Sequence, residues 1–103
     1  MKHFMIKYRF SVGSAEAWHQ LVEQFVATLD NDPDLKGRIA YRCMRETGGA
    51  GYYHLAAALD KDAISALQSK EWFKRYNEET RKVAGGAVEV LPLEIVAETT
   101  IHA

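Results

Sequence analysis

The chain has 103 residues, of which 48% are hydrophobic and 11% aromatic, and its 13 lysines and arginines nearly balance its 14 aspartates and glutamates. This composition excludes intrinsic disorder, and the net charge of -1 argues against a dedicated nucleic-acid or membrane-surface binder. A chain of this length supports one domain, residues 1 to 103, with a single two-layer core, so we expect any sizeable cavity to need a second subunit.

The first elements follow from two different hydrophobic periods. Residues 3 to 10 alternate between apolar and polar side chains, which predicts a strand. From Ser14, a suitable N-cap, apolar residues recur at helical spacing: Trp18, Leu21, Val22, Phe25, Val26 and Leu29. This helix is expected to end at the loop of residues 30 to 34, because Pro33 disfavours helical backbone at the preceding residue.

The second half of the chain is predicted to contain two strands, a helical stretch and a last strand. Residues 37 to 46 and 51 to 59 read as strands joined by a glycine-containing hairpin. Asp60 offers an N-cap for a helical stretch of residues 62 to 84, with a kink or two abutting helices near Ser69. Residues 87 to 98 read as a long last strand in which Pro92 marks a bulge or an edge position.

The order βαββαβ predicts an α+β fold of the ferredoxin-like kind. Both helical stretches have one apolar face, so they should cover one face of a four-stranded antiparallel sheet. The last strand should lie beside the first, followed by the third and the second.

The uncovered face of this sheet is predicted to be an interface. Lys7 and Arg9 cannot lie beneath packed helices, so the even-numbered residues of strand 3 to 10 should face the helices. In strand 51 to 59 we expect the helix side to take Tyr53, Leu55, Ala57 and Leu59, and the open face to take Tyr52, His54, Ala56 and Ala58. With Met5, Arg42 and Met44 also on it, the open face predicts a homodimer that encloses a cleft lined by both chains.

Several segments resemble the antibiotic biosynthesis monooxygenase-like family of dimeric α+β barrels. They are the opening strand FMIKYRF, the helix AEAWHQLVEQF, the segment AISALQSKEWFKRYNEE and the closing VEVLPLEIVAE. The resemblance implies a dimeric α+β barrel and an activity such as the cofactor-independent oxygenation of a phenol or quinol, or haem degradation. Where many members carry an aromatic residue, a histidine and an asparagine, this chain has Ala58, Leu67 and Tyr8, so haem degradation is not expected.

We predict no metal, haem, flavin or nicotinamide cofactor. The four histidines show no HxxxH spacing, the single cysteine, Cys43, lacks an internal disulfide partner, and no glycine-rich dinucleotide motif occurs. The opening residues do not resemble a signal peptide, and no apolar run is long enough to span a membrane. We therefore expect a cytoplasmic protein without a membrane or nucleic-acid partner.

The candidate site residues are those expected around the cleft. His54 is the acid/base candidate, because its ordinary pKa is near neutrality; the alternative is a hydrogen-bonded interface histidine. Arg9 and Arg42 are candidates to hold an anionic or phenolate ligand, unless they pair with glutamates. The aromatic candidates for substrate binding are Tyr52, Trp72 and Tyr76, which the core would otherwise use. Two functions follow: a cofactor-independent monooxygenase of a small aromatic, or a non-catalytic ligand-binding or structural dimer.

Overall fold

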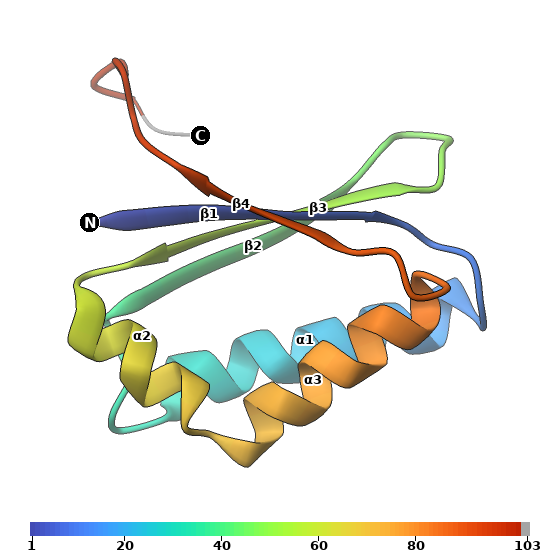
Figure 1. The fold of residues 1–103 in the computed structure, drawn as a ribbon, viewed down its shortest axis with the longest axis horizontal. Helices are drawn as coiled ribbons and strands as arrows, with labels where there is room; N and C mark the ends of the chain where they lie inside the picture. The colour runs from blue at the N-terminus through green and yellow to red at the C-terminus, as the bar shows by residue number, and fades with distance from the viewer. Residues whose placement is uncertain (102–103) are drawn as a thin grey trace.

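The molecule consists of a sheet with helices packed on one side (Figure 1). The computed structural model describes residues 1–101; His102 and Ala103, which the one-domain prediction includes, lie outside the described residues. Along the chain the elements are β1 (Lys2–Arg9), α1 (Ala15–Asn31), β2 (Ile39–Arg45), β3 (Gly51–Ala58), α2 (Lys61–Gln68), α3 (Glu71–Val83) and β4 (Glu89–Leu93). No helix among the described residues has the length and apolar character needed to cross a membrane.

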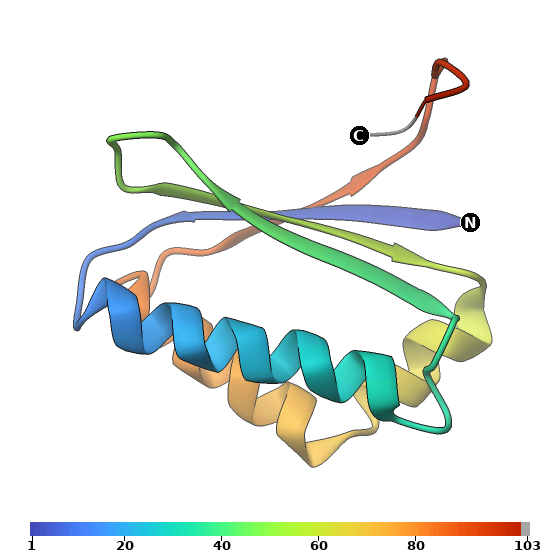
Figure 2. The same cartoon turned by 180° about the vertical axis from the view of Figure 1, so that it is seen from behind.

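The strands pair antiparallel in the order β2-β3-β1-β4, which confirms the predicted α+β plait. Figures 1 and 2 show α1, α2 and α3 on one face of this sheet and the opposite face without cover. The core therefore lies between sheet and helices, where it contains Tyr8, Trp18, Val22, Phe25, Leu29, Tyr52 and Tyr76.

Both predicted N-caps are present. Ser14 Oγ accepts a hydrogen bond from the backbone N–H of Ala17 at 3.2 Å, and the Asp60 carboxylate accepts one from that of Ala63 at 2.9 Å. Each cap satisfies an amide at a helix start that has no partner within the helix. The second helical stretch is two helices rather than one kinked helix, because the backbone of Lys70 is extended (ψ 128°).

Strand β4 is shorter than the predicted strand of residues 87 to 98. It pairs only with β1, from Glu89 opposite Lys7 to Leu93 opposite His3. The pairing ends at Leu93, so the predicted strand residues after it are not part of the sheet. Pro92 lies within this edge strand, which is one of the two alternatives predicted for it and a place where its missing N–H is tolerated.

The predicted orientation of strand β3 is wrong. The register places Tyr52 opposite Tyr8 and His54 opposite Ile6, and residues directly opposite each other in an antiparallel pair share a face. Tyr8 faces the helices, so Tyr52 and His54 do so too and are only 2% and 0% exposed. The segment carries apolar or aromatic residues on both faces, so its alternation alone did not fix the side.

Candidate functional site

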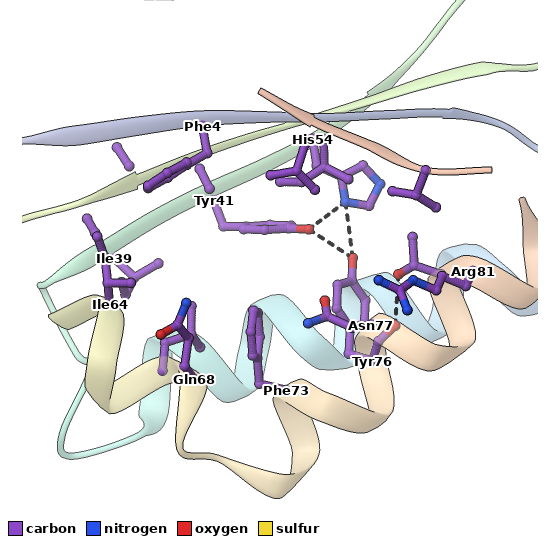
Figure 3. A pocket seen from close by; sticks show the side chains of 18 residues that line it. Phe4, Ile39, Tyr41, His54, Ile64, Gln68, Phe73, Tyr76, Asn77 and Arg81 are labelled. Carbon is purple, nitrogen blue, oxygen red and sulfur yellow. Dashed lines mark hydrogen bonds between the residues drawn. The ribbon is translucent and has the colours of Figure 1, made fainter. Parts of the chain in front are cut away.

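A cavity of about 320 Å³ lies between the sheet and helices α2 and α3 of a single chain (Figure 3). Its walls are mostly apolar and include Phe4, Ile39, Ile64, Leu67, Phe73 and Val90. The expectation that a sizeable cavity needs a second subunit is therefore wrong. This cavity lies on the helix side of the sheet, whereas the cleft predicted from the sequence lies on the open face and stays a prediction. The small side chains of Ala56 and Ala58 on β3 leave this space beneath the helices.

The polar end of the cavity is formed by His54 on β3, Tyr41 on β2 and Tyr76 on α3. The Nδ1 atom of His54 lies 2.5 Å from the Tyr41 hydroxyl and 3.3 Å from the Tyr76 hydroxyl, and the two hydroxyls are 3.2 Å apart. Figure 3 shows the three groups converging from the sheet and the helix. Tyr76 is held in place because its ring stacks on Phe25 with centroids 3.7 Å apart.

The other nitrogen of His54 faces away from this pair and into the core. Its Nε2 atom is 2.7 Å from the hydroxyl of Tyr8, and that hydroxyl accepts a hydrogen bond from Trp18 Nε1 at 2.9 Å. Both ring nitrogens of His54 thus have partners, which is what allows a polar side chain to be fully buried on the helix side of the sheet.

Burial keeps this cluster uncharged at neutral pH. Desolvation lowers the pKa of His54 to about 4, because the imidazolium form loses its hydration. Desolvation also raises the pKa values of Tyr8, Tyr41 and Tyr76 above the ordinary value of a tyrosine. The cluster therefore offers neutral hydrogen-bonding groups to whatever occupies the cavity.

Further polar side chains line the cavity from the helices. Gln68 at the end of α2 and Asn77 and Arg81 on α3 are exposed, and they line the same cavity as the buried cluster. Asn77 and Arg81 are four residues apart, so they lie on the same face of α3. Among the described residues that line the cavity, Arg81 is the one arginine or lysine.

Arg9 and Arg42 do not take part in this cavity. Both are exposed, and the register places Arg42 opposite Leu55 in the middle of β3 and Arg9 opposite Gly51 at its start. They follow the alternation of Lys7 and lie on the uncovered face, as their charge predicts. Because the cavity is on the other face, neither arginine lines it, and their predicted ligand-binding role stays a prediction.

The aromatic candidates are divided between the core and the cavity. Tyr52 stacks on Tyr8, and its hydroxyl is 2.7 Å from Nε2 of His19, so it belongs to the core rather than to the open face. Trp72 packs edge-on against Phe25 and does not line the cavity. His54 and Tyr76 are the candidates that do line it; their roles toward a ligand stay predictions.

Sequence reasoning gave no role to Tyr8, Trp18, Tyr41, Asn77 and Arg81. A signal for the first three was present, because a hydroxyl or indole N–H predicted to face the core needs a hydrogen-bond partner there. No comparable signal marks Arg81, which the sequence does not distinguish from Arg75, the other arginine on α3. No group of three metal-ligating side chains occurs within the part of the chain that the structure describes.

No family model matches this chain, and no curated protein does, but solved structures share its fold. One is a mutant of SnoaB, a cofactor-independent oxygenase from Streptomyces nogalater, with a TM-score of 0.77 and 15% identity over 97% of each chain. Another is a candidate antibiotic biosynthesis monooxygenase from Caulobacter crescentus, with a TM-score of 0.72 and 18% identity over 93% of this chain and 90% of that one. The chain therefore has the fold of proteins named as antibiotic biosynthesis monooxygenases, which confirms the predicted resemblance at the level of the fold.

Proposed function

We propose that the cavity binds a small aromatic molecule with an oxygen substituent, and that the protein is a cofactor-independent monooxygenase of such a phenol or quinol. The observation that carries this proposal is the combination of apolar walls with the His54, Tyr41 and Tyr76 cluster. The walls suit a planar ring, and the cluster suits its oxygen. The fold shared with SnoaB, which is named as a cofactor-independent oxygenase, supports the reaction type.

The chemistry requires an electron-rich ring and dioxygen. A phenol and dioxygen together give a quinone and water: one oxygen atom becomes the new ring carbonyl, and the other leaves as water with the two hydrogens that the phenol loses. The substrate supplies the electrons, so the balance needs no resident redox group. The contribution of the protein is to hold the ring away from water and to stabilise negative charge on its oxygen through hydrogen-bond donors.

Oxygen uptake with a panel of hydroquinones and naphthols tests this proposal. We expect turnover of at least one member by the purified protein without added metal or cofactor. Arg81→Gln should raise KM severalfold, because it removes the cationic side chain that lines the cavity. Arg75→Gln is the matched control, since Arg75 is exposed on the same helix but outside the cavity. No uptake with any member of the panel would contradict the oxygenase proposal.

The alternative function is a non-catalytic ligand-binding protein, and the burial of His54 supports this alternative. His54 is a weak base, because burial lowers its pKa to about 4 and both of its ring nitrogens already contact tyrosine hydroxyls. Calorimetric titration with the same panel separates the two functions. Tight binding that Arg81→Gln weakens, with no oxygen uptake, would establish the binding protein.

We also propose that the protein is a homodimer joined through the uncovered sheet face. The register aligns Leu55, Met5 and Leu91 in one row across this face. Leu91 and Leu93 are 37% and 43% exposed, which is more apolar exposure than a solvated sheet face usually carries. Two such faces packed together would form the dimeric α+β barrel predicted from the sequence. Tyr52 has no part in this interface, because it is in the core.

A further inference from the structure

The hydrogen bonds around His54 run in one direction, which Trp18 sets. An indole N–H donates and cannot accept, so the Tyr8 oxygen is the acceptor in its contact with Trp18. The Tyr8 hydroxyl must then donate its own proton to another acceptor. Among the described residues, the acceptor within reach is Nε2 of His54, at 2.7 Å.

This direction fixes the tautomer of His54. If Nε2 accepts from Tyr8, the neutral imidazole carries its proton on Nδ1, the atom that faces Tyr41 and Tyr76. The opposite tautomer would direct two donors at the Tyr8 oxygen and leave the Tyr8 proton without an acceptor. Tyr8 is only 6% exposed, so that proton would be buried and unsatisfied.

The chain of donors ends at the cavity with one proton left over. Trp18, Tyr8, His54, Tyr41 and Tyr76 each bring one donor proton, and the contacts that join them in sequence use every proton but the last. That last proton belongs to Tyr41 or Tyr76, and both residues line the cavity. The cluster therefore has an O–H to offer to a ligand, whereas both nitrogens of His54 are already engaged.

We propose that this end of the cavity is an oxyanion site that takes the phenolate form of an acidic phenol, and that Trp18 and Tyr8 are positioning residues that hold His54 as a donor. The inference rests on the proposed function, because it names the substrate form for the same cavity. It replaces the role of base predicted for His54: the phenol loses its proton to solvent before it binds. The phenolate oxygen accepts from the tyrosine hydroxyl, and Arg81 provides the compensating charge among the lining residues.

Nitrogen NMR of the ligand-free protein with labelled histidine reads the tautomer directly. We expect His54 to carry its proton on Nδ1 and none on Nε2. Trp18→Phe keeps an aromatic ring but removes the indole donor, so both tautomers should then be populated. Trp72→Phe is the matched control, because Trp72 lies outside this chain of hydrogen bonds. A protonated Nε2 in the wild type, or the same spectrum for both variants, would overturn the positioning role.

Binding of para-nitrophenol tests the oxyanion site, because its ionised form has its own absorption band. Near the pKa of the free probe we expect the bound probe to be mostly phenolate. Tyr76→Phe should weaken its binding about tenfold through loss of a hydrogen bond to a charged oxygen. The matched probe para-nitroanisole has no ionisable oxygen and should bind more weakly, with little sensitivity to Tyr76→Phe.

These measurements separate this inference from the proposed function. Binding of para-nitrophenol in its neutral form, or equal binding of both probes, would overturn the oxyanion site even if oxygen uptake is observed. Phenolate binding with the Nδ1 tautomer but without any oxygen uptake would support the oxyanion site and contradict the oxygenase.

Discussion

His54 is fully buried, and the residues around it explain how the fold accommodates a polar ring there. Hydroxyls from β1, β2 and α3 contact its two nitrogens, so protein groups replace the water that the ring loses on folding. These hydrogen-bond partners suit only the uncharged imidazole ring. The imidazolium form would bring an extra proton and a charge into a site where its three contacts are neutral hydroxyls.

The stability of the protein should therefore fall as the pH drops from 6.5 to 4. The pKa of His54 is about 4 in the folded chain against 6.5 without burial. Between these values the unfolded chain binds more protons than the folded chain, so acidification favours unfolding. The difference corresponds to about 3 kcal/mol at full effect. Urea unfolding of wild type and His54→Gln across this pH range measures it. Parallel curves for the two proteins would show that His54 does not contribute.

Sequence alone located the site residues only in part, for reasons that differ between residues. The orientation of β1, with its even-numbered residues toward the helices, was predictable because the charges of Lys7 and Arg9 exclude burial. Tyr52 and Tyr53 are identical in type and adjacent, so hydrophobicity did not decide which one faces the helices. His54 was predicted on the uncovered face because its polarity suggested exposure. In the structure, tyrosines distant in the sequence provide its hydrogen-bond partners.

At the scale of elements, the cavity depends on the division of the second helical stretch into α2 and α3. Both helices contribute to its lining. Their junction is tied to the loop after α1, because Lys70 Nζ lies 3.3 Å from the Asp32 carboxylate and 2.6 Å from the Asp34 carboxylate. These ion pairs join the loop after α1 to the junction between α2 and α3.

Removal of the cap of α2 should destabilise the protein more than loss of a neighbouring charge. Asp60→Ala leaves the Ala63 amide without its acceptor, which typically costs about 1 kcal/mol. Asp62→Ala is the matched control, because it removes an acidic residue from the first turn of the same helix without removing the cap. Urea denaturation compares the two free energies of unfolding. An equal loss for both variants would mean that charge near the helix start, and not the cap, matters.

The elements themselves were largely predictable, and the exception has a physical cause. Helical periodicity, two N-caps and the glycine-containing hairpin are local signals, and the structure confirms each of them. The end of β4 is not a local feature, because it depends on how far this strand pairs with β1. Sequence patterns within 87 to 98 carry no information about that partner.

At the scale of the whole molecule, the two faces of the sheet are proposed to have different functions. The helix side encloses the cavity and its polar cluster within one chain, so a ligand site does not require a second subunit. The uncovered side carries the row of Leu55, Met5 and Leu91, which is proposed to pair with a second copy. Changes on the two faces should therefore affect different properties.

A charge in the middle of the uncovered face should dissociate the homodimer. Leu55→Glu would place a carboxylate in each half of the interface, where packing against the second copy would desolvate both this carboxylate and Arg42, the residue opposite it in the register. Val96→Glu is the control, because Val96 is 98% exposed and follows the last strand. Sedimentation equilibrium at micromolar concentration should show a dimer for wild type and Val96→Glu and a monomer for Leu55→Glu. A monomeric wild type would contradict the proposal.

The central claim, that the ligand site lies beneath the helices of one chain, is tested most directly by methyl NMR during titration with a naphthol. We predict that the methyl signals of Ile64 and Leu67, which line the cavity, shift in proportion to occupancy. The methyl signals of Leu55 and Leu91, on the uncovered face, should stay in place. Shifts confined to Leu55 and Leu91 would place the ligand between two sheets and contradict this account.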